Sequence, residues 1–421
     1  MEEKSQDNNK KMNNINHNED LSKSIISNLI VRSVNCSKRT IDVTSKLIDS
    51  LMTQNKNGII SICEGGLPDD LPELRSLIWK INLGYLPLNT KEWDKILKSK
   101  RIAYQKYKKS VFDKLEEELK LFDNYDKKTK EEISELNKTT SKLLLEEICK
   151  DTNRTHSGMS FFNTPIDKKN KLTEKELIQM MENKRNCSLK DIKFTYKINI
   201  VLTHSDIIAR ILFIYSKFEP IISYVQGMNE ILAPIYYCFA FDIKNDEQSM
   251  DELEADSFWC FYNLMMTLKV LFNKNADDND IGISGKANKI KIMLQMIDKK
   301  LYEHIMKSGF EFKLLSFRWV SLLFSQDFDL IDTLRIWDYL LSADNILKNI
   351  YYFCIAVILQ RKDKLMMQKV SGIYESLQNI KDLCVEGTIA NAINIQKKYD
   401  YICKPIIEQE SDQTKKKTIF I

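Results

Sequence analysis

Hydrophobic residues recur every three or four positions along most of the chain, which is the spacing of one face of an α-helix. Between residues 206 and 218 these positions are Ile207, Ile208, Ile211, Leu212, Tyr215 and Phe218. The pattern stops at Pro220, which lacks a backbone N–H donor. A wholly apolar stretch, residues 231–241, follows. No segment alternates polar and apolar residues over the length of a strand, so the pattern predicts an all-α fold.

Start and stop signals place further helices. Pro72 suits the first turn of a helix that ends at Gly84. A long apolar stripe over residues 90–122 predicts one helix, and a capping box of Thr129 and Glu132 begins the next helix. After residue 241 the same spacing predicts helices over about 255–273, 286–307, 310–325, 331–342, 345–361, 364–379 and 388–401.

Polar segments divide the chain into parts. Residues 1–20 are rich in Asn, Lys, Glu and Asp and are expected to be disordered. Residues 21–56 are expected to form a helical extension that packs on a main domain over residues 57–403. Its apolar face is predicted to consist of Val43, Leu47, Ile48, Leu51 and Met52. Residues 163–204 are interpreted as a polar surface insertion and residues 404–421 as a C-terminal tail.

A polar turn separates the two apolar segments described first, at Tyr224-Val225-Gln226-Gly227-Met228-Asn229-Glu230. Glycine allows a positive φ or a close backbone approach, so Gln226 could present its side-chain amide at the rim of the core. The alternative is a buried turn in which Gln226 caps a helix end.

A second polar segment, residues 148–156, follows a predicted helix and contains Asp151 and Arg154. An Asp three positions before an Arg is commonly a local ion pair at a helix end. Alternatively, the long side chain of Arg154 projects from the helix end toward a partner. Further upstream, Arg75 and Trp79 share one helix face, where Trp79 suits the core and Arg75 a partly buried ion pair.

Taken in order, these segments match four motifs of one family. Arg75-x-x-x-Trp79 is followed by Ile148-x-x-Asp151-x-x-Arg154, by Tyr224-x-Gln226-Gly227-Met228-Asn229, and by Arg318-Trp319, Asp327-Phe328 and Trp337-Asp338. Over roughly residues 58–341 the chain resembles the TBC family, the helical GTPase-activating proteins of Rab GTPases. The residues around these motifs resemble the member-thirteen branch of that family.

The resemblance implies a single extended domain of two helical subdomains and a site with two catalytic side chains. Arg154 would be an arginine finger, and Gln226 would orient the attacking water. Asp151, Tyr224, Gly227 and Asn229 would support them. Arg75, Trp79, Arg318, Trp319, Trp337 and Asp338 would be structural motif residues. Two adjacent positions depart from the family pattern, because His156 and Ser157 stand where an aromatic residue and a proline are common.

The resemblance also sets expectations about partners. The partner would be a GTP-bound Rab that supplies GTP and Mg²⁺, so this chain is expected to need no cofactor and no metal of its own. The protein would act in the cytoplasm, recruited peripherally to endomembranes in vesicle trafficking. It would be an enzyme activator that completes an active site in trans. Two alternatives are a non-catalytic Rab-binding effector or scaffold of the same fold, and a helical adaptor unrelated to GTPases.

Composition excludes several other classes. Of 421 residues, 63 are Lys or Arg and 59 are Asp or Glu, and this small net charge argues against nucleic acid as a partner. Nine cysteines without a C-x-x-C pair and four histidines without i, i+4 spacing argue against zinc and favour reduced, mostly buried thiols. The longest apolar run, residues 231–241, is shorter than the roughly 20 residues of a membrane span. Gly285-Lys286 fails the P-loop pattern, because Ala287 stands where Ser or Thr is required.

Overall fold

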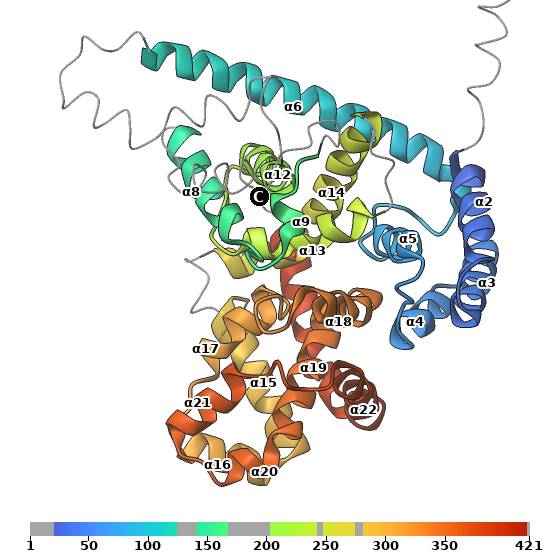
Figure 1. Ribbon diagram of the computed structural model, residues 1–421. Coiled ribbons are helices and arrows are strands. Elements are labelled where there is room, and N and C mark those ends of the chain that lie inside the picture. The colour runs from blue at the N-terminus through green and yellow to red at the C-terminus, as the bar shows by residue number, and fades with distance from the viewer. Residues whose placement is uncertain (1–20, 124–140, 167–202, 242–246, 274–280, 419–421) are drawn as a thin grey trace, which may run out of the picture.

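The computed structural model describes residues 21–123, 141–166, 203–241, 247–273 and 281–418 (Figure 1). Every named secondary-structure element in these ranges is a helix. One isolated β-bridge joins Pro165 to Thr203. The predicted all-α class is therefore confirmed. The helices form two subdomains stacked on each other, with the N-terminal helices along one flank of the junction (Figure 1). Residues 1–20 and most of the predicted insertion at 163–204 lie outside the described residues, as does the capping box of Thr129 and Glu132.

The N-terminal layer contains more helices than the sequence pattern indicated. Its members are α2 (Leu21–Ser33), α3 (Lys38–Met52), α4 (Lys56–Glu64) and α5 (Pro72–Asn82). Leu47 and Leu51 of α3 are buried as predicted, but Met52 is 80% exposed, because α3 ends there and the chain turns away. Asn55 caps α4 by accepting a hydrogen bond from the backbone N–H of Gly58.

The first subdomain is built around two buried helices. Its members are η1 (Thr90–Glu92), α6 (Trp93–Asp123), α8 (Ser141–Arg154), α9 (Ser160–Asn163), α12 (His204–Phe218), α13 (Met228–Ala240), α14 (Glu247–Leu268) and η2 (Lys269–Phe272). Apolar residues cover α12 and α13 on nearly all sides, because α8 and α14 pack around them. In the apolar stretch at residues 231–241, the aromatic residues Tyr236, Tyr237 and Phe239 are buried. Phe241 is 49% exposed, because it lies just past the end of α13.

The second subdomain is broken more often than the periodicity predicted. It contains α15 (Ile283–Ile297), α16 (Lys299–Lys307), α17 (Phe312–Ser316), η4 (Phe317–Ser321), α18 (Leu330–Ser342), α19 (Ile346–Gln360), α20 (Lys362–Met366), α21 (Val370–Gln378) and α22 (Val385–Thr418). The helix predicted over 286–307 is two helices, because Asp298 ends α15 and its carboxylate caps α16 at Leu301. The prediction of one continuous helix over 310–325 is wrong. Only Phe312–Ser316 is α-helical, and Phe317–Ser321 is a π-helix. The segment predicted as a tail from residue 404 instead continues α22 past Pro405, where buried Cys403 and Ile407 hold it against the core.

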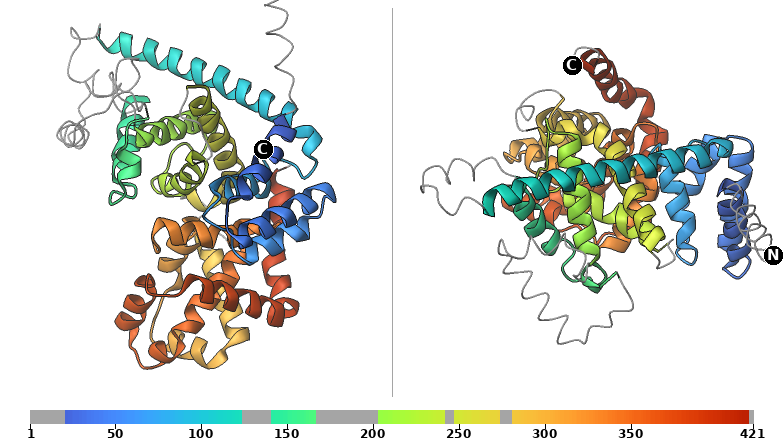
Figure 2. Two further views of the ribbon diagram at one scale, coloured as in Figure 1. Left: turned by 45° about the vertical axis from the view of Figure 1, so that its right-hand side comes forward. Right: turned by 90° about the horizontal axis from the view of Figure 1, so that it is seen from above.

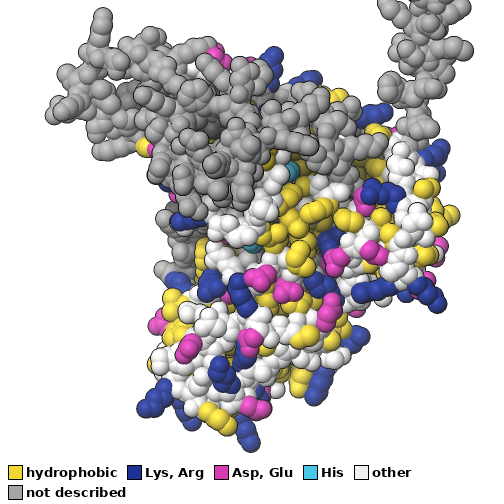
Figure 3. Space-filling model, in the orientation of Figure 1, with side chains coloured by type: hydrophobic (Ala, Val, Ile, Leu, Met, Phe, Trp, Pro, Cys, Tyr) yellow, Lys and Arg dark blue, Asp and Glu magenta, His cyan; other side chains and the backbone are white. Residues whose placement is uncertain are grey.

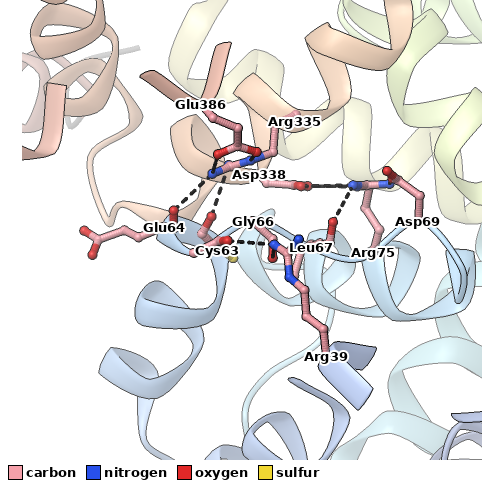
Figure 4. Close-up of polar contacts among 11 residues, drawn as sticks. Arg39, Cys63, Glu64, Gly66, Leu67, Asp69, Arg75, Arg335, Asp338 and Glu386 are labelled. Atoms are coloured by element: carbon pink, nitrogen blue, oxygen red, sulfur yellow. Dashed lines mark hydrogen bonds and ion pairs between the residues drawn. The ribbon is translucent and has the colours of Figure 1, made fainter. Parts of the chain in front are cut away.

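A buried ion pair joins the N-terminal layer to the second subdomain (Figure 4). The fully buried carboxylate of Asp338, on α18, accepts hydrogen bonds from Arg75 Nε at 3.1 Å and from Trp79 Nε1 at 2.8 Å, both on α5. Arg75 also donates to the backbone oxygen of Leu67 at 3.2 Å and to the carboxylate of Asp69 at 2.7 Å. The expectation that Trp79 is core and Arg75 an ion-pair partner is therefore confirmed in geometry.

Further contacts fasten the N-terminal layer to the second subdomain beside this pair (Figure 4). Arg335 donates to the backbone oxygens of Cys63 and Glu64, at 3.3 and 3.0 Å, and is also bound by the carboxylate of Glu386 at 2.7 and 2.9 Å. The Trp79 ring stacks on the Trp337 ring with centroids 5.7 Å apart. On the face shown in Figure 3, the surface of the second subdomain carries acidic and basic side chains side by side.

Candidate functional site

The turn between α12 and α13 presents Gln226 to solvent. Gly227 has φ of +104°, a conformation that residues with a Cβ rarely adopt, and it begins α13. A Cβ at Gly227 would lie 2.9 Å from Leu322 Cδ2, so the turn also needs the space that glycine leaves. Gln226 itself is exposed, whereas Gly227 and Met228 are buried. The alternative of a buried, capping Gln226 is therefore wrong, and the presented amide is what the structure shows.

A buried hydrogen-bond network ties this turn to the end of α8. The Tyr224 hydroxyl donates to Asp151 Oδ2 at 2.6 Å, and the backbone N–H of Gly227 donates to Asn229 Oδ1 at 3.1 Å. The Asn229 amide donates to Thr155 Oγ1 at 2.7 Å. Burial and the Asp151 carboxylate raise the pKa of Tyr224 well above its ordinary value, so its hydroxyl stays protonated and donating. The network fixes both polar segments relative to each other.

Arg154 is the last residue of α8, and its side chain is 60% exposed. Its Nη2 lies 2.6 Å from Asp151 Oδ1, while the other oxygen of Asp151 accepts from Tyr224. Asp151 is buried, so a single carboxylate binds the guanidinium of the exposed arginine and the hydroxyl of the buried tyrosine at once. Both interpretations of this segment are therefore correct, because the arginine makes a local ion pair and also projects from the helix end.

Arg154 and Gln226 line one pocket of about 730 Å³ between the two subdomains. The first subdomain contributes polar groups to it, including Tyr224, Asn229 and Glu230. Its other walls are mainly apolar and comprise Leu271, Phe272, Phe317 and Leu322, with the amide of Gln326. Two exposed side chains that can form hydrogen bonds thus share a depression with an apolar lining, which is a suitable surface for a partner's polar group.

Glu230 is a member of this pocket that the sequence analysis did not assign to the site. Its Oε1 accepts a hydrogen bond from Asn229 Nδ2 at 3.1 Å. Burial raises the pKa of Glu230 to about 7. Hydrogen bonds from Gln326 and Asn229 and the positive charge of Arg154 oppose this rise. The sequence held one signal for it, an acidic residue in the first turn of α13 directly after the conspicuous Gln226–Asn229 segment.

His156, which stands where the resemblance predicted an aromatic residue, takes part in aromatic packing. Its ring stacks on Phe162 with centroids 5.6 Å apart, and the backbone adopts φ of +44°. Burial lowers the pKa of His156 to about 4, so the ring is neutral at physiological pH. The Met159 N–H donates to the His156 backbone oxygen at 2.8 Å, and this turn closes the loop after Arg154.

The structural motif residues lie around the site rather than in it. Trp319 and Trp337 are buried, and the Trp337 indole donates to the backbone oxygen of Leu323 at 2.9 Å, next to pocket-lining Leu322. Arg318 pairs with buried Asp327 at 2.8 Å. Burial raises the pKa of Asp327 to about 6, and Arg318 opposes that shift. These residues shape the second-subdomain wall of the pocket.

Comparisons with known proteins place the chain in a family. A model of the Rab-GTPase-TBC domain matches residues 167–366, a range that includes the Gln226 turn. The human protein "TBC1 domain family member 13" is 30% identical over 367 residues, which cover 76% of this chain and 88% of that protein. The chain belongs to the TBC domain family.

Other TBC proteins extend the likeness in sequence and fold. The fission-yeast (Schizosaccharomyces pombe) "GTPase-activating protein gyp1" is 24% identical over 372 residues, covering 84% of this chain and 58% of that protein. The crystal structure of the Ypt/Rab-GAP domain of Gyp1p superposes with a TM-score of 0.58, covering 84% of this chain and 99% of that chain at 20% identity. That likeness shows a shared fold for the TBC domain.

The described residues show little sign of other kinds of site. Within these ranges no three His, Cys, Asp or Glu side chains gather as metal ligands would. The helices that the structure describes include none long and apolar enough to cross a bilayer. Six of the eight described cysteines are buried and all eight are free thiols, as the sequence indicated.

Proposed function

We propose that this TBC protein is a GTPase-activating protein for GTP-bound Rab-family GTPases. Relatives named as GTPase-activating proteins support the class. The observation that carries the proposal is that exposed Arg154 and exposed Gln226 line one pocket and are held by one network through Asp151, Tyr224 and Asn229.

The chemistry of GTP hydrolysis requires the two groups that this pocket presents. Negative charge spreads over the phosphoryl oxygens in the transition state, and a water must be held in line for attack. The guanidinium of Arg154 would pair with those oxygens through two N–H groups, which a lysine cannot reproduce. The Gln226 amide has a donor and an acceptor on one flat group, so it can orient the water.

The pairing of Arg154 with Asp151 suits such a role. A long side chain loses conformational freedom when it is fixed at a partner, and a pre-formed contact lowers that cost. Because Asp151 is also bound by Tyr224, the guanidinium of Arg154 is held at Nη2 before the GTPase arrives. GTP and Mg²⁺ would come with the GTPase, and this chain would supply side chains alone. The setting would be the cytoplasmic face of endomembranes, in vesicle trafficking.

Single-turnover GTP hydrolysis by a panel of purified Rab proteins tests the proposal. Wild type, Arg154→Ala and Gln226→Ala are compared on each GTPase. We expect stimulation of one or a few Rabs that both substitutions abolish. Binding of GTP-loaded Rab without stimulation by the wild type would place the protein among effectors or scaffolds. Absence of binding to every Rab would favour a helical adaptor.

A further inference from the structure

Helix α6 carries a row of lysines along one side. The row begins just before the helix, in η1, and runs for about five turns. Its exposed members, separated by three, four or eight positions, are Lys91, Lys95, Lys98, Lys106 and Lys109. Ile102, which is 56% exposed, fills the gap in the middle. At 100° per residue all six positions fall within an arc of about 80°, so lysines that look scattered in the sequence form a line about 27 Å long.

This lysine row points away from the body of the protein. The opposite side of α6 is buried, through Trp93, Leu97, Tyr104, Val111 and Leu115. Tyr104 packs on Phe258 of α14 with ring centroids 4.9 Å apart and donates its hydroxyl to Glu254 at 2.8 Å. Seen from above, α6 crosses in front of the helices of the first subdomain (Figure 2). The lysine row is therefore the crest of a ridge.

The charges of the lysine row are not neutralised by other described residues. No ion pair with a described acidic side chain forms at any of its five lysines. In contrast, two cations on the flanks of α6 form ion pairs. Arg101 pairs with Asp256 at 2.9 Å, and Lys108 pairs with Glu254 at 2.8 Å. Two neighbouring acids are engaged locally, because Asp94 accepts from the Ser22 N–H and Glu92 from the Asn89 amide. Exposed Asp113, one turn after Lys109, marks the C-terminal end of the row.

We propose that the lysine row of α6 binds the surface of an anionic lipid membrane. Four to eight basic residues on one helix face are what anionic headgroups attract, and each adds about fivefold to binding. Lysine presents a hydrated point charge on a flexible stem, which suits a fluid headgroup layer, whereas paired recognition of the carboxylates of an acidic peptide favours arginine. A straight, convex row fits a flat surface better than it encloses a peptide, and Ile102 can enter the interface between the charges.

Membrane binding by this row would leave the proposed GTPase site open. The pocket is lined by residues of α8, α13, η2, η4 and the adjoining turns, and none of its lining residues belongs to α6. The lipid proposal concerns a separate surface and does not depend on the GTPase activity. An assay with vesicles and no GTPase therefore tests it independently.

The test is sedimentation of the full chain with vesicles of phosphatidylcholine that contain about 30% phosphatidylserine. Pure phosphatidylcholine vesicles serve as the lipid control. The row variant carries Lys95→Gln, Lys98→Gln, Lys106→Gln and Lys109→Gln. A matched control variant loses four exposed lysines from the opposite end of the molecule, on or next to α16 and α20 (Figure 1), through Lys300→Gln, Lys307→Gln, Lys364→Gln and Lys369→Gln. Both variants lose the same charge, and glutamine keeps a good helix propensity at the α6 positions.

We expect wild type and the control variant to bind the anionic vesicles, with binding that weakens as salt rises. The row variant should bind at least 100-fold more weakly, because four contributions of about fivefold are lost. Equal binding of the two variants would overturn the proposal, as would equal binding of wild type to neutral vesicles. If wild type instead binds a polyglutamate peptide and no vesicle, the row recognises an acidic protein segment and the lipid assignment is wrong. Circular dichroism of both variants verifies that α6 is intact.

Discussion

At the scale of single residues, Asp151 connects the two halves of the proposed site. One oxygen of its buried carboxylate binds exposed Arg154 and the other binds buried Tyr224. The sequence allowed either a local ion pair or a projecting arginine, and no periodicity could show that one carboxylate allows both. The sequence could not reveal the perturbed pKa of Glu230, because burial in the folded chain raises it and a hydrogen bond from Gln326, far along the chain, opposes that shift.

Replacement of Arg154 by lysine separates charge from geometry. Arg154→Lys keeps the positive charge but loses the paired N–H donors. We expect Rab binding to persist and stimulation of GTP hydrolysis to fall by about 10³-fold or more, as for loss of an arginine finger. Single-turnover hydrolysis and a separate binding assay measure the two effects. Lys150→Ala, at an exposed position on the same helix, is the control and should change neither. Undiminished stimulation by Arg154→Lys would contradict the role proposed for this residue.

Glu230 predicts a pH-dependent stability. Its pKa is about 7 in the folded chain and 4.5 for an ordinary glutamic acid. The folded state thus favours the protonated form, so the stability that Glu230 contributes is fully present below pH 4.5 and is lost as pH rises through 7. Glu230→Gln should abolish this loss and make the protein more stable than wild type by about 1–3 kcal/mol at pH 8, with a smaller difference at pH 5.

Urea unfolding of wild type and Glu230→Gln at pH 5, 6.5 and 8 measures this difference. Glu303→Gln is the control, because Glu303 lies in an exposed i, i+4 pair with Lys299. Its difference from wild type should stay small at each pH. A difference for Glu230→Gln that does not grow with pH would show that the carboxyl group titrates in the ordinary range.

At the scale of elements, helix existence was predictable and helix continuity was not. The apolar stripes located α5, α6, α12 and α13, because packing of one face determines those helices. The breaks at Asp298 and at the π-helix of residues 317–321 depend on capping and on packing against distant helices, which periodicity does not contain. The turn before α13 was predictable, because Gly227 marks it in the sequence. The clash that makes its glycine necessary, with Leu322, joins residues almost one hundred positions apart.

This turn gives a prediction that combines the backbone strain of a positive φ with a steric clash at Gly227. Gly227→Ala must hold a positive φ and place a Cβ 2.9 Å from Leu322. Gly84→Ala is a matched control, since Gly84 has φ of +68° and nothing within 4 Å of an added Cβ. We expect Gly84→Ala to cost about 1 kcal/mol of stability from φ alone, and Gly227→Ala about 2–4 kcal/mol. Thermal unfolding measures both. Gly227→Ala should also reduce Rab stimulation, because Gln226 is displaced, and equal costs for the two variants would show that Leu322 moves aside freely.

At the scale of the whole molecule, the ion pair of Arg75 and Asp338 ties the N-terminal layer to the second subdomain, and α5 of that layer also packs on α13 of the first subdomain. The N-terminal layer therefore bridges the two subdomains. The proposed site depends on how they are placed, because its polar wall belongs to the first subdomain and much of its apolar wall to the second. The sequence indicated each partner separately, as an arginine on a helix face and as a Trp-Asp motif. It could not show that positions 263 residues apart in the chain are in contact. Charge at this scale was also hidden, since a net charge of +4 gives no sign of an ordered lysine row on α6.

Removal of one partner from this junction should destabilise the entire domain. Asp338→Ala leaves the buried guanidinium of Arg75 without its main acceptor and the Trp79 indole N–H without one as well. Loss of one side of a buried pair costs about 3–5 kcal/mol, because the remaining charge stays buried and unpaired. Glu386→Ala removes a carboxylate of the second subdomain that binds Arg335, the arginine that donates across the same junction to Cys63 and Glu64. The Glu386 side chain is 63% exposed, so its loss should cost less than about 1 kcal/mol. Urea unfolding, monitored by tryptophan fluorescence, compares the free energies of unfolding of the two variants. If Asp338→Ala costs no more than Glu386→Ala, packing such as the Trp79–Trp337 stack holds the N-terminal layer on the second subdomain, and the ion pair serves only to fix their register.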